Sequence, residues 1–160
     1  MAAERRYWLG LFSHGTWNTF VANGAHTIGF RENRWPIVQK LKPGDYVLAY
    51  LTGVSRWIGA LVVTGEPFFD ASPLWAEDVL PARVKVKPLV MLTPETAVPI
   101  AELRDKLTLF RKLKNPNAWT GRLRGAPARW TRGDGEAVVE ALLDAQVNPV
   151  VREVDGRKLA

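Results

Sequence analysis

The stretch that most constrains the fold is residues 42–67, KPGDYVLAYLTGVSRWIGALVVTGEP. A Pro-Gly turn leads into a first run of strand-forming residues, a short loop leads into a second run, and Gly-Glu-Pro ends the stretch. Two such runs joined by a short loop predict a β-hairpin. The first run, from Tyr46 to Leu51, is apolar on both faces, which is typical of a strand covered on two sides. We therefore expect the hairpin at the centre of a barrel or a layered sheet.

Further strands and short helices are predicted around this hairpin. Residues 7–12 form an apolar run that predicts a strand, and Ser13 then offers a cap for a helix. Residues 82–92 alternate cationic residues with valines, as in a strand with one wet face, so Arg83 is expected to point outward. No regular strand-helix-strand alternation is present. The predicted fold class is α+β, a mixed β-barrel of five to six strands with short flanking helices.

Length and hydrophobic content indicate one folded domain. The chain has 160 residues, 47% of them hydrophobic, which suffices for the core of a single unit. We expect this domain to span residues 1–147. The composition then becomes polar and irregular, so residues 148–160 are expected to form a C-terminal tail, either a frayed end or a linker to another domain.

Charge and cysteine content limit the partners. Lys and Arg number 22 against 16 Asp and Glu, and the sequence pI is about 9.9, a balance that favours phosphate-rich polymers or acidic membranes. The chain has no cysteine, which excludes disulfides and thiolate zinc sites. Its N-terminal apolar run is too short for a signal peptide, and no run approaches membrane-spanning length. We expect a cytoplasmic protein with no membrane partner, metal or cofactor.

Seven sequence segments follow one another along residues 6–145 in the same order as in a known domain family. They are YWLGLFS, IGF, LKPGDYVLAYL, IGALVVTGEPFFD, LPARVKVKPL, RKLKNPNAW and GAPARW. In this order the chain resembles the EVE domain of the PUA-like superfamily, and the KPGD-strand-loop-IG-strand-EP core is the specific part. It is similar, more distantly, to YTH domains and to the modified-base-reading modules of McrBC-type restriction systems.

The resemblance implies a PUA-like barrel with an aromatic-lined pocket that receives one base of DNA or RNA, often a methylated one. Carried over by position, the base-binding pocket consists of Ser13, Trp17, Gly29, Phe30 and Trp75, with Trp57 as a neighbouring candidate. Many EVE sequences have a Trp two residues before the glycine that corresponds to Gly29, and this chain has Thr27 there. Phe30 or Trp57 is then the candidate for that wall of the aromatic cage.

Physical chemistry supports such a pocket and also offers a simpler reading of each aromatic residue. Stacking of an extruded base on an aromatic face contributes about 1–3 kcal/mol. Buried tryptophans more often fill a core, and this is the expectation for Trp8, Trp35, Trp119 and Trp130. For Trp17 and Trp75 both readings remain open.

The arginines allow two readings as well. Arg31 and Arg34 flank the loop that should border the pocket. Four more lie in one Gly-containing segment suited to following phosphates; they are Arg122, Arg124, Arg129 and Arg132. The alternative is that these side chains only solvate the surface.

No catalytic motif is present, because the sequence has no metal-ligand spacing, nucleophile elbow or phosphate loop. The favoured function is therefore a nucleic-acid-binding module that accepts one flipped or unpaired, modified base in the pocket. The first alternative is a small nucleoside- or nucleotide-processing enzyme on a PUA-like barrel, in the manner of ASCH domains. That enzyme would need a Lys or Glu in the pocket. A protein-interaction accessory is the second alternative.

Overall fold

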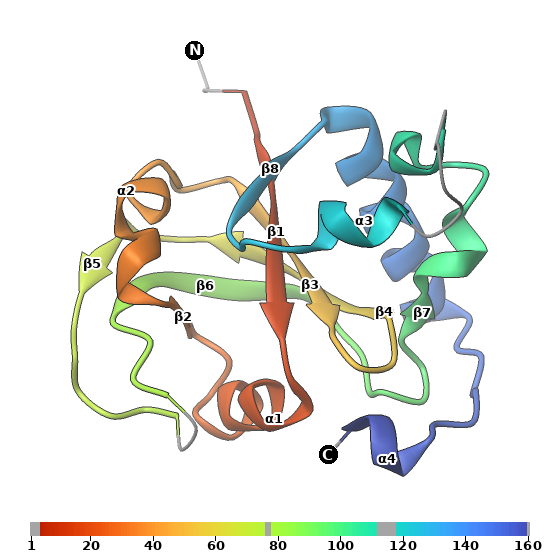
Figure 1. Cartoon of the computed structure of the whole chain (residues 1–160), viewed down its shortest axis with the longest axis horizontal. Coiled ribbons are helices and arrows are strands. Elements are labelled where there is room, and N and C mark those ends of the chain that lie inside the picture. The colour runs from red at the N-terminus through yellow and green to blue at the C-terminus, as the bar shows by residue number, and fades with distance from the viewer. Residues whose placement is uncertain (1–3, 76–77, 112–117, 160) are drawn as a thin grey trace.

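An eight-stranded mixed sheet forms the body of the structure, a computed structural model that describes residues 4–75, 78–111 and 118–159 (Figure 1). Six strands follow the order β2-β6-β4-β3-β1-β8, and two short strands, β5 and β7, pair with β6 and β4. The strands are β1 (Tyr7–Phe12), β2 (Thr27–Phe30), β3 (Tyr46–Leu51), β4 (Arg56–Val63), β5 (Phe68–Phe69), β6 (Ala82–Met91), β7 (Val98–Pro99) and β8 (Ala128–Trp130). This curled half-barrel sheet confirms the predicted α+β class with a mixed sheet, with eight strands among the described residues in place of the expected five to six.

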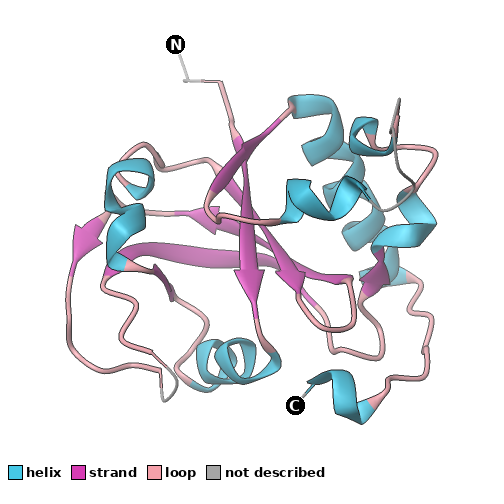
Figure 2. Ribbon diagram, viewed as in Figure 1, coloured by secondary structure: helices cyan, strands magenta, loops and turns pink. Residues whose placement is uncertain are grey.

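Helices, most of them short, lie around the periphery of the sheet (Figure 2). They are α1 (His14–Ala22), η1 (Glu32–Arg34), α2 (Trp35–Val38), η2 (Ile100–Leu103), η3 (Thr108–Phe110), η4 (Ala118–Leu123), α3 (Arg132–Val147) and α4 (Gly156–Leu159), where η marks a 3₁₀ helix. A capping box begins α1, because the Ser13 hydroxyl accepts from the Thr16 N–H and the Thr16 hydroxyl accepts from the Ser13 N–H. This box stops β1 and starts the helix at the same residue.

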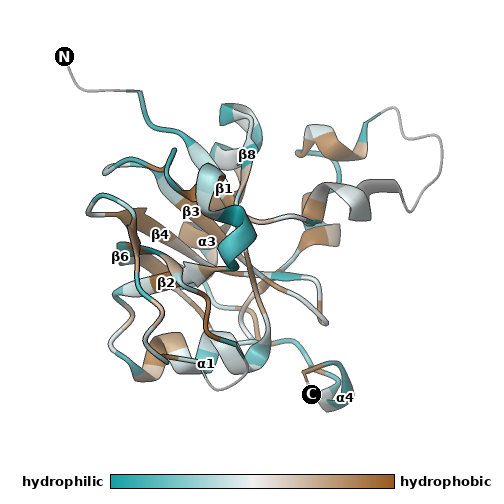
Figure 3. Ribbon diagram, turned by 60° about the vertical axis from the view of Figure 1, so that its left-hand side comes forward, coloured by the Kyte–Doolittle hydropathy of each residue, from teal (hydrophilic) through white to brown (hydrophobic). Residues whose placement is uncertain are grey.

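The predicted hairpin is confirmed as β3 and β4, in the middle of the sheet. Strand β3 pairs parallel with β1 and antiparallel with β4. Its alternate residues enter two separate clusters: Val47 and Leu51 pack inside the half-barrel, whereas Leu48 and Tyr50 pack on the outer face against α3 and η2. Figure 3 shows the hydrophobic character of these central strands. The apolar residues on both faces of β3 therefore result from two cores, one on each side of the sheet.

The segment after α3 is in contact with the rest of the chain. The Arg152 guanidinium bonds both carboxylate oxygens of Glu102, at 2.8 and 2.9 Å, and the Arg56 guanidinium donates to the carbonyl of Glu153 at 2.8 Å. Leu159 in α4 packs against the core inside the half-barrel. Arg152, Glu153 and Leu159 thus contact the rest of the fold, while the C-terminal tail and the domain boundary at residue 147 stay predictions.

Candidate functional site

A cavity of about 660 Å³ lies where the sheet fails to close on itself. Strand β2 is one edge of the sheet and pairs with β6, while β1 pairs with β3 and β8. No ladder joins β1 to β2 among the described strands, and the cavity occupies the gap between them. Its lining comes from the end of β1, the start of α1, β2, the loops around residues 31–34 and 125–126, and Trp75, Asp78 and Leu80. The volume is within the range of about 300–1,000 Å³ typical of small-ligand sites.

Three aromatic rings contribute to the apolar wall of the cavity. Phe12, Phe30 and Trp75 line it and are 8%, 7% and 6% exposed. Each ring therefore offers only a small part of its surface to a ligand in this state of the cavity. Gly29 lies beside Trp75, because a Cβ atom on Gly29 would fall 2.8 Å from Cη2 of the indole and 2.6 Å from the carbonyl oxygen of Leu80.

Two of the predicted aromatic residues lie elsewhere. Trp17 is 2% exposed and packs inside the half-barrel, with its ring 5.2 Å from those of Phe12 and Phe20. Trp57 is fully buried in the outer core, 5.0 Å from Tyr50 and 5.3 Å from Trp130. The structure does not bring these two predicted rings to the cavity, since α1 turns Trp17 towards the barrel and β4 turns Trp57 towards the opposite face. Trp8 and Trp130 are also buried, as expected, while the Trp119 side chain lies outside the described residues.

Polar groups at the cavity differ in whether they already have partners. Ser13 lines the cavity, but its hydroxyl is occupied by the α1 capping box. The Asn33 amide and the Trp75 indole N–H line the cavity or its wall and make no hydrogen bond with any described residue. Asn33 was not singled out from the sequence, although it lies between the two predicted arginines of the same loop. Its amide offers two donors and one acceptor to the edge of a ligand.

The two arginines of this loop have different surroundings. Arg34 donates to the carbonyls of Gly125 at 2.6 Å, Ala126 at 3.2 Å and Pro127 at 3.0 Å. It therefore joins two walls of the cavity and has fewer donors left for a phosphate. Arg31 is exposed and lies 3.9 Å from the carboxylate of Asp78, which also lines the cavity. This pair is loose enough for a phosphate to compete for the guanidinium.

The arginines at residues 122–132 differ in how free their side chains are to bind a phosphate. The side chain of Arg122 lies outside the described residues. Arg124 and Arg129 are exposed and have no ion pair within the described part of the chain; Arg129 lies over the Trp8 ring at 5.8 Å. Arg132 bonds Glu136 at 2.7 Å and Glu4 at 3.0 Å, and its hydrogen bond to Glu136 is the main cause of a raised pKa. A phosphate at Arg132 would have to compete with these two exposed carboxylates, and its role in phosphate binding stays a prediction.

Arg83 also departs from its expected place. The alternation in β6 predicts an outward side chain, yet Arg83 is 1% exposed because the loop after β5 folds over this face of the strand. Asp70, in the same loop, accepts the Ser72 backbone N–H at 2.8 Å. Hydrogen bonds from Ser72 are the main cause of a lowered Asp70 pKa, and the charge of Arg83 adds to them.

The described residues contain no group of three or more side chains arranged to hold a metal ion. None of the helices in the described ranges is long and apolar enough to cross a membrane.

Comparisons with known proteins identify the fold. No protein-family model and no curated protein matches the chain. The Pho92 YTH domain, solved in complex with m6A, is 11% identical, with a TM-score of 0.68 over 94% of this chain and 91% of that one. The Mmi1 YTH domain, solved with RNA, is also 11% identical, with a TM-score of 0.67 over 94% of this chain and 85% of that one. Protein Atu2648 from Agrobacterium tumefaciens is 17% identical, with a TM-score of 0.59 over 94% and 99%. The chain therefore has a YTH-like fold.

Proposed function

We propose that this protein is a cytoplasmic EVE-type nucleic-acid-binding module that takes one flipped or unpaired, methylated base of DNA or RNA into the cavity between β1 and β2. The observation that carries the proposal is the position of this cavity: Ser13, Gly29, Phe30 and Trp75, which the family resemblance assigns to the base pocket, all line it. Two arginines assigned to phosphate binding, Arg31 and Arg34, lie at the same cavity. Two of the similar structures, solved in complex with m6A and with RNA, support the same class of ligand.

The roles of the residues follow from their surroundings. The rings of Phe30 and Trp75 supply apolar surface for the base, and stacking of this kind contributes about 1–3 kcal/mol per base. The Trp75 N–H donates to an acceptor on the base edge, and the Asn33 amide reads a donor and acceptor pair. Arg31, Arg124 and Arg129 hold phosphates on either side.

A methyl group on the base adds modest selectivity. Burial of one methyl contributes about 0.8 kcal/mol, which corresponds to about a four-fold difference in affinity. A stronger preference would require unsatisfied polar groups in the complex with the unmodified base.

The test is a titration of labelled single- and double-stranded oligonucleotides that carry cytosine, 5-methylcytosine, 5-hydroxymethylcytosine, adenine or N6-methyladenine, each at two salt concentrations. We expect salt-sensitive binding that Trp75→Ala weakens at least about five-fold, the loss of one stacking contact. Phe69→Ala is the matched control, because Phe69 is an exposed aromatic residue outside the cavity. Equal affinities of the two variants, with both proteins folded, would contradict the base pocket.

The enzyme alternative has a separate test. The described lining of the cavity contains no Lys or Glu, and its one carboxylate is Asp78. Incubation of the protein at high concentration with modified nucleosides, followed by product analysis, decides between the two functions. Turnover that is lost in Asp78→Asn would replace the binding module by an enzyme.

A further inference from the structure

A buried arginine lies behind the cavity wall. Arg83 pairs with Gly29 across the β2–β6 ladder. Gly29 has no side chain and so leaves room for the Trp75 ring. Arg83 is only 1% exposed, and its guanidinium carbon lies 5.2 Å from the centroid of the same ring. A buried guanidinium needs partners for its charge and its donors.

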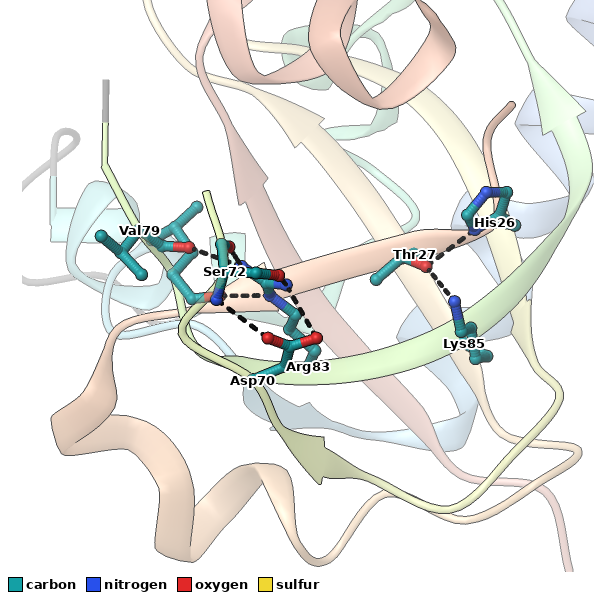
Figure 4. A network of polar contacts seen from close by, with 8 residues as sticks. His26, Thr27, Asp70, Ser72, Val79, Arg83 and Lys85 are labelled. Carbon is teal, nitrogen blue, oxygen red and sulfur yellow. Dashed lines mark hydrogen bonds and ion pairs between the residues drawn. The ribbon is translucent and has the colours of Figure 1, made fainter. Parts of the chain in front are cut away.

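Those partners come from both ends of one loop, as Figure 4 shows. At the beginning of the loop Arg83 donates to the Ser72 hydroxyl at 3.1 Å and to the Ser72 carbonyl, and it lies 3.6 Å from the Asp70 carboxylate. At the end of the loop it donates to the carbonyls of Val79 and Leu80, both at 3.1 Å. One side chain therefore ties together the two ends of the loop that carries Trp75.

Apart from the packing of Trp75 on Gly29, few other hydrogen bonds of the described residues anchor this loop. The Asp70 N–H donates to the Pro81 carbonyl at 2.9 Å, and the Asn23 amide reaches the Leu74 carbonyl at 3.5 Å. Ordering such a segment costs conformational entropy. The hydrogen bonds of Arg83 are the largest set that offsets this cost.

We propose that Arg83 is a positioning residue of the pocket: it holds the described loop residues 70–75 and 78–80 in place, and Trp75 with them, so that the aromatic wall is formed before a base arrives. This inference rests on the proposed function for its effect on binding, but not for its effect on the loop. Lys cannot replace Arg here, because an ammonium group cannot reproduce the planar fork that spans Ser72 and Leu80.

A preformed wall changes affinity in a recognisable way. The apparent dissociation constant is the intrinsic one divided by the fraction of molecules in the competent state. If loss of the fork lowers that fraction to about one tenth, affinity falls about ten-fold. The loss lies in the association rate, because the bound complex keeps the same contacts with the base.

The experiment compares Arg83→Lys with Lys87→Arg, a matched exchange at an exposed position of the same strand. Hydrogen exchange of the 70–80 amides, oligonucleotide association and dissociation rates, and overall stability are measured for both variants. We expect Arg83→Lys to increase exchange in this loop and to slow association about ten-fold with little change in dissociation. Lys87→Arg should match the wild type. Unchanged exchange in the loop, or a loss confined to the dissociation rate, would overturn the proposal.

Two further outcomes are separable. If the wild type binds no oligonucleotide, the proposed function fails, while the exchange measurement still tests Arg83. If Arg83→Lys does not fold, Asp70→Asn replaces it, because Asp70 lies at the surface and its loss removes one of the loop contacts of Arg83. Asp70→Asn should then increase exchange in residues 70–75 and slow association by a smaller factor, and wild-type behaviour of this variant would reject the proposal.

Discussion

Gly29 and Trp75 are in direct contact across the wall of the cavity, and no side chain larger than hydrogen fits at position 29. A Cβ atom there would lie 2.8 Å from the indole and 2.6 Å from a backbone oxygen. We expect Gly29→Ala to displace the 70–80 loop, to destabilise the protein by about 1–3 kcal/mol and to weaken oligonucleotide binding. Urea unfolding and the titration described above measure the two effects.

The control for this change is Gly133→Ala. Gly133 lies in the first turn of α3, and a Cβ atom there would meet nothing within 4 Å. Alanine favours a helix over glycine by up to about 1 kcal/mol, so this variant should be at least as stable as the wild type. Unaltered binding in Gly29→Ala would mean that the contact with Trp75 does not shape the pocket.

Trp17 should behave as a core residue. We expect Trp17→Ala to lower the free energy of unfolding by about 3–5 kcal/mol, because the ring is buried among Phe12 and Phe20. Met91→Ala, at a position 41% exposed, should change stability little. The milder Trp17→Phe should bind oligonucleotides with wild-type affinity wherever it is folded, and a specific loss of binding would return Trp17 to the pocket.

Asp78 opposes binding through its charge. Asp78→Asn removes a carboxylate from the cavity mouth and frees Arg31, which lies 3.9 Å away. Exposed ion pairs contribute about 0.2–1 kcal/mol, so we expect affinity for oligonucleotides to rise by up to about five-fold. Asp105→Asn, at an exposed position outside the cavity, is the control. Weaker binding of Asp78→Asn would instead indicate a direct hydrogen bond from the base to the carboxylate.

Arg124 and Arg129 should each contribute to the salt dependence. If each contacts one phosphate, replacement by Gln lowers the slope of log affinity against log salt by about 0.7–0.9. The loss should be similar for all base sequences, because phosphate contacts carry no sequence information. Arg104→Gln, on the far side of the sheet beside η2, should leave the slope unchanged. If neither Arg124→Gln nor Arg129→Gln changes the slope, the phosphates of the oligonucleotide do not contact these two arginines.

The 70–80 loop should loosen in acid. The Asp70 pKa is lowered in the folded state, mainly by its hydrogen bonds from Ser72. The stabilisation that ionised Asp70 gives the folded state is therefore complete above the ordinary Asp pKa of about 3.9. It is lost as the pH falls through the lower pKa of Asp70 in the folded state. We expect hydrogen exchange in residues 70–75, corrected for its intrinsic pH dependence, to rise below about pH 4. Asp70→Asn should show no such rise.

The central hairpin could be predicted because its signal is local: a Pro-Gly turn, two apolar runs and a short loop lie within one stretch of sequence. Gly29 and Phe30 could be assigned to the cavity because the order of the sequence segments resembles that of a known family. Trp17 and Trp57 could not be assigned from sequence, because an indole suits a core and a ligand site equally well. What separates them is the face of α1 or β4 on which each lies.

Arg83 illustrates a second limit. Strand alternation correctly puts its side chain on the face opposite Val84, and a charged residue on that face would ordinarily meet water. The loop that covers this face begins after β5 and returns before β6. The residue pattern of β6 does not reveal that a loop covers it. The burial of Arg83 depends on the contact between β6 and the loop after β5, which strand alternation cannot predict.

The unclosed seam between β1 and β2 gives the molecule two parts with separate tasks. Leu48 and Val47 lie in the two cores and do not line the cavity, whereas Asn33 and Arg31 are exposed residues that do. If the cavity admits a base as proposed, substitutions at Asn33 and Arg31 should alter the base preference with little change in melting temperature. A half-barrel of this kind is suited to acquiring new preferences one loop residue at a time.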